Sequence, residues 1–267
     1  MRNIRRIIEA KKSESWQSVK SQRETAQLMT PQMPPMLPAK RQLIIVGAGG
    51  YGSLVVAVVD EINARALKHH QEAPWDIVGY ADSDTAKRGR LHSGRAVHGT
   101  IEETNRGFHG RELWFFCAIG ENDVRAKIVR TAEELGWRPA TLVHPTAILG
   151  PNVEIGPGSY VGPVSVISVN TRIGAHVIID MHVSIGHDAV LNNFCAVFPG
   201  ARISGSCSLG EYALVGSNAT LLPGTQVGER AVVGASSLAH GSVEPDTTIL
   251  GVPARIVRRR RNSLSQQ

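Results

Sequence analysis

The chain has 267 residues, of which 42% are hydrophobic and 19% charged, a composition that excludes wholesale disorder. No apolar run approaches the roughly 18 residues that span a bilayer. The basic amino terminus lacks the apolar core of a secretory signal. The 3 cysteines form neither a CxxC pair nor an even set, which is typical of a reducing compartment. We therefore expect a cytoplasmic protein that does not insert into a membrane.

The net charge of +6 is concentrated at the two ends of the chain. Residues 1–40 and residues 251–267 each carry a net charge of +5, so the 210 residues between them sum to −4. A nucleic-acid-binding module is expected to carry its positive charge on a folded face interleaved with aromatic side chains, and only 5% of this chain is aromatic. The distribution predicts no nucleic-acid partner.

The first forty residues are polar and basic, and four of the eight residues in 31–38 are proline. Proline at this density excludes a helix or a central strand. We predict a basic tail and proline-rich linker over 1–40. The consecutive arginines from Arg258 to Arg261 predict a second basic tail over 258–267.

A small α/β domain is predicted over residues 41–140. Residues 43–46 are a continuous apolar run, typical of a strand buried on both faces. Further strands are predicted over 77–81 and 113–119, and helices over 53–67 and 121–135. Strands that alternate with helices indicate a parallel, Rossmann-like sheet.

The first predicted strand runs into a glycine loop. Gly47, Gly49 and Gly52 have the GxGxxG spacing of dinucleotide-binding proteins. Taken alone, this spacing suggests an NAD-dependent oxidoreductase. About one hundred residues are fewer than the two mononucleotide-binding halves of such a domain require, which disfavours that alternative.

The strongest signal in the sequence is a period of six residues. Fifteen aliphatic residues follow one another at this spacing without a slip: Leu149, Ile155, Val161, Ile167, Ile173, Ile179, Ile185, Leu191, Val197, Ile203, Leu209, Val215, Leu221, Val227 and Val233. Glycine follows nine of them. This is the hexapeptide repeat of a parallel β-helix, in which each short strand points one aliphatic side chain inward. We predict the β-helix over residues 141–257.

The combination resembles the hexapeptide-repeat acyltransferases with a left-handed β-helix. Among them it is similar to the bacterial sugar acetyltransferases, which include nucleotide-4-amino-sugar N-acetyltransferases and sialic acid O-acetyltransferases. The motifs that carry the resemblance are residues 47–52 with 54–56, 77–82, 99–102, 118–122 with Arg125, 142–147, 185–188, Phe194 with 199–200, and 251–255. The resemblance implies acetyl-CoA as co-substrate, no metal, and homotrimers with active sites between neighbouring β-helices.

His187 and Asp188 follow the repeat residue Ile185 by two and three positions. In the resembling enzymes this histidine is the general base, and the adjacent acid raises its basicity. An amine or hydroxyl that attacks a thioester must lose a proton, and a neutral imidazole is a suitable acceptor. A carboxylate stabilises the imidazolium that forms. We predict a catalytic role for both residues.

The resemblance also implies a coenzyme site. With the family's coil of 18 residues, Gly205 stacks beside His187, and its N–H is the expected donor to the oxyanion. Ser217 and Ala235 match family positions that bind the pantetheine arm through the main chain. Arg255 is expected to meet the 3′-phosphate of CoA.

The glycine loop is implied to hold the nucleotide sugar. Gly49, Gly50 and Tyr51 are expected to face this substrate, and Asp82 and Ser83 to contact its base. The sequence departs from the family here, because Tyr51 replaces the usual histidine and Ser83 replaces the second of two consecutive acids.

A third departure concerns the coenzyme. Ala196 stands where the family often has a histidine that contacts acetyl-CoA, so that contact is absent or replaced.

These features predict an acetyl-CoA-dependent acetyltransferase that acts on a sugar, above all on the 4-amino group of a nucleotide-linked deoxysugar for surface glycan synthesis. Sugar O-acetylation, as on sialic acid, is the alternative. A non-catalytic or carbonic-anhydrase-like β-helix is disfavoured, since a shared zinc site needs about three histidines that converge. His176 and His182 share a phase of the repeat but are expected on different faces of one coil.

Overall fold

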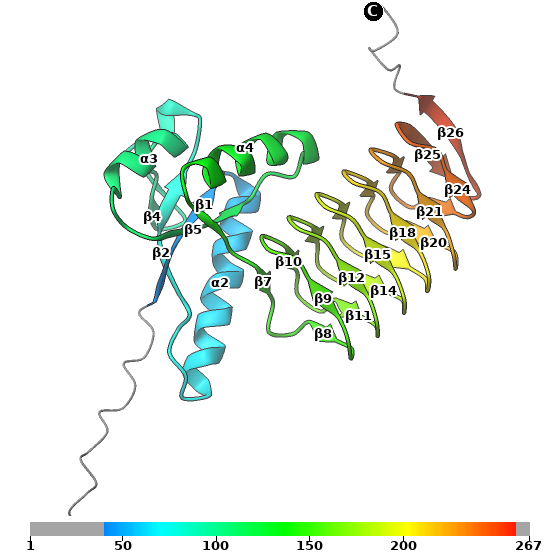
Figure 1. Cartoon of the computed structure of the whole chain (residues 1–267), viewed down its shortest axis with the longest axis horizontal. Helices are drawn as coiled ribbons and strands as arrows, with labels where there is room; N and C mark the ends of the chain where they lie inside the picture. The colour runs from blue at the N-terminus through cyan, green and yellow to red at the C-terminus, as the bar shows by residue number, and fades with distance from the viewer. Residues whose placement is uncertain (1–39, 260–267) are drawn as a thin grey trace, which may run out of the picture. The chain divides into compact units, whose positions relative to one another are not determined.

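The structure is a computed structural model that describes residues 40–259 (Figure 1). The predicted tail over 1–40 lies outside the described residues except for Lys40, as does the predicted tail over 258–267 beyond Arg259. In the described part of the chain, no helix is both long and apolar enough to cross a membrane.

The α/β domain is built on a four-stranded parallel sheet in the order β2-β1-β5-β6. Its strands are β1 (Arg41–Val46), β2 (Trp75–Ala81), β5 (Leu113–Cys117) and β6 (Arg138–Pro139). Its other elements are α2 (Gly50–Lys68), the 3-10 turn η1 (Thr85–Lys87), the hairpin of β3 (Leu91–His92) and β4 (Arg95–Ala96), α3 (Ile101–Gly107) and α4 (Asn122–Glu134). The apolar run of β1 is buried on both faces, as the sequence predicted.

Helix α3 was not predicted from the sequence. A capping box begins it, because the Thr100 hydroxyl accepts from Glu103 N–H and the Glu103 carboxylate accepts from Thr100 N–H. Helix α2 also begins three residues earlier than predicted, at Gly50. The first turn of α2 is therefore formed by the glycine loop itself.

The remaining strands form a parallel β-helix with three faces, which confirms the β-helix predicted from the six-residue repeat. Face 1 contains β7 (Leu142–Val143), β10 (Tyr160–Val161), β13 (Ile178–Ile179), β16 (Ala196–Val197), β19 (Leu214–Val215), β22 (Val232–Val233) and the terminal hairpin of β25 (Thr247–Gly251) and β26 (Ala254–Arg259). Face 2 contains β8 (Ile148–Leu149), β11 (Val166–Ile167), β14 (Ser184–Ile185), β17 (Arg202–Ile203), β20 (Thr220–Leu221) and β23 (Leu238–Ala239). Face 3 contains β9 (Glu154–Ile155), β12 (Arg172–Ile173), β15 (Val190–Leu191), β18 (Ser208–Leu209), β21 (Gln226–Val227) and β24 (Ser242–Val243).

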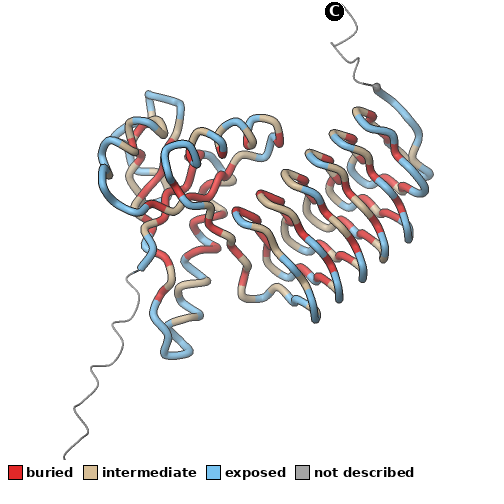
Figure 2. Tube along the Cα trace, in the orientation of Figure 1, coloured by how far each residue is buried: buried red, intermediate tan, exposed pale blue. Residues whose placement is uncertain are grey.

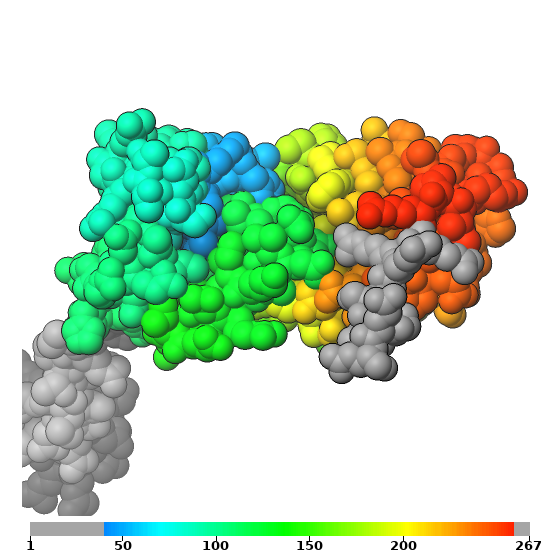
Figure 3. All heavy atoms as spheres, turned by 90° about the horizontal axis from the view of Figure 1, so that it is seen from above, coloured from blue at the N-terminus to red at the C-terminus, as the bar shows by residue number. Residues whose placement is uncertain are grey.

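The register of the β-helix is uniform as far as β23. Ile167 of one coil pairs with Ile185 of the next, and Ile185 with Ile203, so residues 18 apart lie one above the other. At the carboxyl end the spacing falls to 16 residues, since Gln226 pairs with Ser242 and Val232 with Thr248. The coils follow one another in chain order, from green through yellow to red (Figures 1 and 3). We call the turns between the faces corner 1–2, corner 2–3 and corner 3–1.

The repeat aliphatics fill the interior of the coils, and Figure 2 shows the buried positions recurring along them. The first coil is an exception to the expected inward packing. Leu149 is 41% exposed and Ile155 is only partly buried. The reason is that this coil has a neighbouring coil on one side only.

The α/β domain and the β-helix share one hydrophobic core. A single cluster of buried side chains includes Val55 of α2 and Phe116 of β5 together with Tyr160, Ile178 and Ala196 of face 1. Removing the α/β domain would expose these three face 1 residues. Experiments on the substrate site therefore call for point variants of the full chain.

Candidate active site

His187 and Asp188 lie at corner 2–3, directly after strand β14. His187 Nδ1 is 2.8 Å from Asp188 Oδ2. An ionised carboxylate only accepts hydrogen bonds, so Nδ1 carries the proton and Nε2 is left as an acceptor. The hydrogen bond from His187, followed by one from Asn170, holds the pKa of Asp188 below its usual value. The arrangement is that of a base with its partner carboxylate.

Gly205 lies one coil further on at the same corner, against the His187 ring. A Cβ atom added at Gly205 would lie 2.5 Å from His187 Nε2, so only glycine leaves the ring its present place. Within residues 40–259 the Gly205 N–H donates to no acceptor. The structure thus places a free main-chain donor beside the proton acceptor.

The predicted coenzyme residues lie elsewhere. Ser217 and Ala235 stack at corner 1–2, where Ser236 N–H donates to the Ser217 carbonyl at 2.8 Å. Arg255 is exposed on β26, and its Nη1 donates to the neighbouring Ala254 carbonyl at 3.0 Å. Face 2 separates corner 1–2 from corner 2–3, so one chain does not bring these residues together with His187.

Tyr51 lines a pocket of about 200 Å³ between the glycine loop and face 1. The other lining residues are Gly120, Ile178, Asp180, Phe198 and Pro199. The Tyr51 hydroxyl is buried and has no hydrogen-bond partner among the described residues. Burial raises the pKa of Asp180, whose carboxylate accepts from Met181 N–H at 2.7 Å. The pocket therefore offers a carboxylate in a mostly apolar lining.

Asp180 was not identified from the sequence. The available signal was its place directly after the repeat aliphatic Ile179, where glycine stands in nine of the fifteen repeats. A charged residue at this position points to a local function.

Gly49 and Gly50 are exposed at the start of α2. The helix is 19 residues long, its amino terminus has no side-chain cap, and its first turn has no acidic residue. Unpaired N–H groups and the helix dipole make such an end favourable for an anion. His92 braces the loop, because its Nε2 lies 3.1 Å from the Gly49 carbonyl oxygen and 2.8 Å from Ser53 Oγ.

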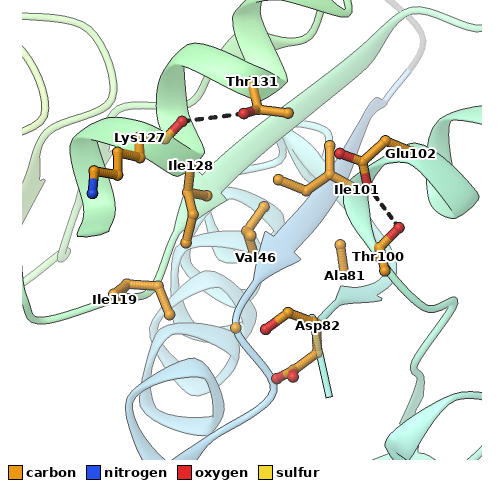
Figure 4. Close-up of a pocket in the computed structure, with 12 residues that line it drawn as sticks. Val46, Ala81, Asp82, Thr100, Ile101, Glu102, Ile119, Lys127, Ile128 and Thr131 are labelled. Carbon is orange, nitrogen blue, oxygen red and sulfur yellow. Dashed lines mark hydrogen bonds between the residues drawn. The ribbon is translucent and has the colours of Figure 1, made fainter. Parts of the chain in front are cut away.

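Asp82 and Ser83 line a second pocket, of about 310 Å³, at the carboxyl ends of β1 and β2. Figure 4 shows its apolar side chains, Val46, Ile101, Ile119 and Ile128, around the centre, with Asp82 at one side. Ligands of open α/β sheets bind at this edge of the sheet. An apolar slot with a polar rim suits a flat ring such as a nucleobase.

The Asp82 carboxylate is engaged by its own surroundings. It accepts from Ala48 N–H at 2.7 Å, from Asp84 N–H at 2.8 Å and from Lys87 Nζ at 3.0 Å. Burial alone would raise the pKa of Asp82, but these hydrogen bonds hold it below its usual value. Asp82 thus fixes the shape of the loop around the pocket.

Ala196 is completely buried, among Tyr160 and Ile178 of the shared core. The α/β domain covers the position at which the family often has a histidine.

The histidines considered for zinc lie at different corners of the β-helix. His176 is buried at corner 3–1, stacks on Phe194 at 5.1 Å and lies 3.3 Å from Glu133 Oε1. His182 is exposed at corner 1–2. Over residues 40–259 no group of three His, Cys, Asp or Glu side chains is placed to hold a metal ion.

Two protein families match the chain. Residues 42–132 match the PglD N-terminal domain, and residues 207–236 match the hexapeptide repeat of succinyl-transferase. The chain is thus a hexapeptide-repeat protein with an α/β domain before its β-helix. More particularly, that α/β domain matches the PglD N-terminal domain over most of its length.

Solved structures of acetyltransferases share this fold. One is a histidine variant of perosamine N-acetyltransferase from Caulobacter crescentus with CoA and GDP-perosamine, with 28% identity, a TM-score of 0.70, and 80% of this chain and 96% of that chain covered. Another is the acetyltransferase domain of PglB from Neisseria gonorrhoeae FA1090 with acetyl coenzyme A, with 28% identity, a TM-score of 0.70, and 82% and 100% covered. The predicted fold class, a Rossmann-like domain followed by a left-handed β-helix, and the resemblance to sugar acetyltransferases are confirmed.

Curated relatives match over shorter segments. The lipopolysaccharide biosynthesis O-acetyl transferase WbbJ of Escherichia coli K12, whose assignment is provisional, is 43% identical over 56 residues, 21% of this chain and 29% of that protein. Serine acetyltransferase of Synechococcus elongatus is 30% identical over 85 residues, 29% and 35% of the two chains. The chain thus spans about a third of the length of these relatives.

Proposed function

We propose that this chain is an acetyl-CoA-dependent acetyltransferase that acts on a sugar, above all on the 4-amino group of a nucleotide-linked deoxysugar for surface glycan synthesis. The observation that carries the proposal is the His187–Asp188 pair beside the free N–H of Gly205. Acyl transfer from a thioester needs a base and an oxyanion donor next to each other. Structures of similar fold that hold CoA and GDP-perosamine support the co-substrate and the class of acceptor.

His187, Asp188 and Gly205 each have a defined role in the proposed reaction. The acceptor nitrogen attacks the thioester carbonyl carbon, and His187 Nε2 takes the proton that the nitrogen releases. Gly205 N–H stabilises the negative oxygen of the tetrahedral intermediate, and Asp188 stabilises the imidazolium. Collapse of the intermediate breaks the C–S bond, and the proton passes from His187 to the departing CoA sulfur.

The acceptor has three candidate contacts in the α/β domain. The amino terminus of α2, with Gly49 and Gly50, suits the diphosphate. The pocket at Asp82 and Ser83 suits the base. The pocket at Tyr51 suits the sugar, since the Asp180 carboxylate that lines it can bond to sugar hydroxyl or amino groups.

The positions of the two halves of the proposed site support a shared assembly. His187 and Gly205 lie at corner 2–3, whereas Ser217 and Ala235 lie at corner 1–2. A homotrimer that sets corner 2–3 of one chain against corner 1–2 of its neighbour completes each site with acetyl-CoA between chains. In this arrangement, Arg255 is the proposed contact to the 3′-phosphate. We place the enzyme in the cytoplasm, where acetyl-CoA is available.

An O-acetyl product is the second candidate. The 43% identity with WbbJ favours it, because that protein carries the name of an O-acetyl transferase. The base and the oxyanion donor serve a hydroxyl as well as an amine.

A screen of acceptors tests the proposal. The full chain is incubated with acetyl-CoA and with UDP-, GDP- or dTDP-linked 4-amino sugars, their 4-hydroxy counterparts, or sialic acid, and the release of CoA thiol is followed. We expect release with a 4-amino sugar nucleotide and none with its hydroxy counterpart. Release with the hydroxy sugars alone would establish O-acetylation. An absence of release with every acceptor would contradict the proposed activity.

A further inference from the structure

Three residues at corner 2–3 stack in successive coils and lead to the catalytic pair. Asn152, Asn170 and Asp188 are 18 residues apart, and each has a φ of +57°. Asn152 Nδ2 donates to Asn170 Oδ1 at 3.1 Å, and Asn170 Nδ2 donates to Asp188 Oδ1 at 3.1 Å. The other oxygen of Asp188 accepts from His187 Nδ1 at 2.8 Å. The four side chains form one continuous hydrogen-bonded chain.

The direction of these hydrogen bonds is fixed by the Asp188 carboxylate at the end of the series. An ionised Asp188 only accepts, so Asn170 must turn its NH2 group toward it. The Asn170 carbonyl oxygen then faces Asn152, which in turn must donate. Each amide therefore has one orientation that satisfies its neighbour, and the last bond leaves Nε2 of His187 unprotonated.

Asp188 depends on Asn170 for its orientation. The side chains of His187 and Asp188 are 61% and 52% exposed, and an exposed carboxylate otherwise exchanges its partners with water. Glu154 and Arg172 line the same groove of about 470 Å³. Among the described residues, however, only His187 and Asn170 bond to the Asp188 side chain.

We propose that Asn170 is a positioning residue of the acetyl transfer: it holds Asp188 so that the His187 ring keeps its proton on Nδ1 and presents Nε2 toward Gly205. This inference rests on the proposed function of His187 as the base. The row of hydrogen-bonded side chains ends at Asp188. Ser206, the next residue at this corner, bonds to His187 through its main chain, with its N 2.8 Å from the His187 carbonyl oxygen.

A purely structural role makes a different prediction. Stacked asparagines in the left-handed conformation stabilise a turn wherever they occur, and Asn152 is such a residue. Asn152→Gly and Asn170→Gly both keep a positive φ accessible and both remove one amide. The two variants are therefore matched in backbone and differ in their contact with Asp188.

The test follows the His187 ring in the full chain by ¹⁵N NMR, with His187→Ala to assign its signals. We expect the Nδ1–H form to predominate in the wild type and in Asn152→Gly. In Asn170→Gly the ring is expected to shift toward the Nε2–H form. On the sugar nucleotide that the acceptor screen selects, kcat should fall about tenfold, with the KM for acetyl-CoA unchanged.

Asn170→Asp keeps the size of the side chain but turns an acceptor toward Asp188, so it should repel the carboxylate and produce the same shift. This second variant decides the question if Asn170→Gly does not fold. A wild-type ring signal in these Asn170 variants would overturn the inference and leave His187 as the proposed base. A fully active His187→Ala would instead overturn the proposed function, whatever the ring signals show.

Discussion

Arg125 of helix α4 donates a hydrogen bond of 2.8 Å to the main-chain oxygen of Phe194, at corner 3–1 of the β-helix. Its guanidinium also reaches the His176 carbonyl at 3.3 Å, and Asn122 donates to the Tyr212 carbonyl at 2.8 Å. Residues 176, 194 and 212 occupy successive coils. Two side chains of one helix turn thus bond to three coils, and Arg125 does so while only 1% exposed.

The side chains of the same corner form a stack along α4. The ring of His176 stacks on Phe194, and Phe194 stacks on Tyr212 at 5.3 Å. Arg230 covers Tyr212, with its guanidinium 4.3 Å from the ring centre, and pairs with Asp123 of α4. This part of the interface between the domains is therefore built from one side chain per coil.

Replacing Arg125 with Met should destabilise the fold. The Met side chain has a similar volume but donates no hydrogen bond, so several buried carbonyl oxygens lose their partner at a cost of about 3 kcal/mol in total. Urea unfolding of the full chain measures this loss. Arg130→Met, at an exposed position of the same helix, is the control and should stay within about 0.5 kcal/mol. Equal effects of the two substitutions would show that the bonds of Arg125 do not hold the interface.

His176 should make the stability depend on pH. Burial lowers the pKa of His176, as does nearby Arg125, and this outweighs the opposing effect of Glu133. The unfolded chain then binds the proton more readily than the folded one. Stability that is complete above the ordinary histidine pKa of about 6.5 is lost as the pH falls from that value through the lower pKa of the folded state.

Thermal unfolding at pH 7.5 and pH 5.5 checks this sign. His176→Phe preserves the stack on Phe194 but cannot be protonated, so its Tm should fall less between the two pH values than that of the wild type. The other histidines are common to both proteins. A larger fall in the variant would reverse the sign assigned to His176.

The β-helix could be predicted from the sequence because its six-residue repeat follows directly from its geometry. One inward aliphatic per strand fixes the register of each strand, and the 18-residue coil of the resembling family predicted that Gly205 lies beside His187. Strand β1 could be predicted from its apolar run, since a strand buried on both faces has no polar positions. Helix α3 was missed although its capping residues, Thr100 and Glu103, stand in the sequence as a local signal.

The contacts between distant segments could not be predicted from the sequence. Arg125 bonds to carbonyl oxygens 51 and 69 residues away, and carbonyl oxygens leave no trace in the residue types. Asp180 meets Tyr51 in a pocket only because α2 packs against face 1. Such sites depend on how two domains dock, which neither periodicity nor local propensity encodes.

The proposed trimer predicts the effect of a charge on face 2. This face lies between the two corners that meet in the assembly, and Ile148, Val164 and Val166 expose aliphatic side chains on it or at its edge. Light scattering of the full chain should give three times the monomer mass of 28.8 kDa. Val166→Asp should lower this mass, because a buried unpaired carboxylate is costly.

Leu67→Asp is the control for this experiment, since Leu67 is exposed near the far end of α2. It should remain trimeric. A stable wild-type monomer at micromolar concentration would contradict the shared active site.

Gly205→Ala tests whether the reaction depends on the position of the His187 ring. The added methyl group meets the His187 ring, an exposed side chain that can turn away, so the fold should keep its Tm within a few degrees. The ring then no longer faces the reacting nitrogen, and kcat should fall by roughly 10²-fold. Gly107→Ala, where the methyl group meets open space, should change neither quantity. A Gly205→Ala enzyme with the wild-type kcat would show that the ring position is not critical.

His187→Ala is the most direct test of the proposed mechanism. Loss of a general base should lower kcat by roughly 10²–10⁴-fold while acetyl-CoA binding stays nearly unchanged, because the ring acts on the acceptor and not on the coenzyme. Acetyl-CoA affinity is measured by calorimetry, and kcat by thiol release. His69→Ala, at an exposed histidine after α2, is the matched control and should retain the wild-type rate.

Asp188→Asn separates the carboxylate from the base. Without the Asp188 charge the imidazolium that forms during the reaction is less stable, so kcat should fall, but by less than in His187→Ala. Thiol release at saturating acceptor measures kcat in both variants. A wild-type kcat in Asp188→Asn would mean that Asp188 does not stabilise the charged ring, and the pair would then be two neighbouring surface residues.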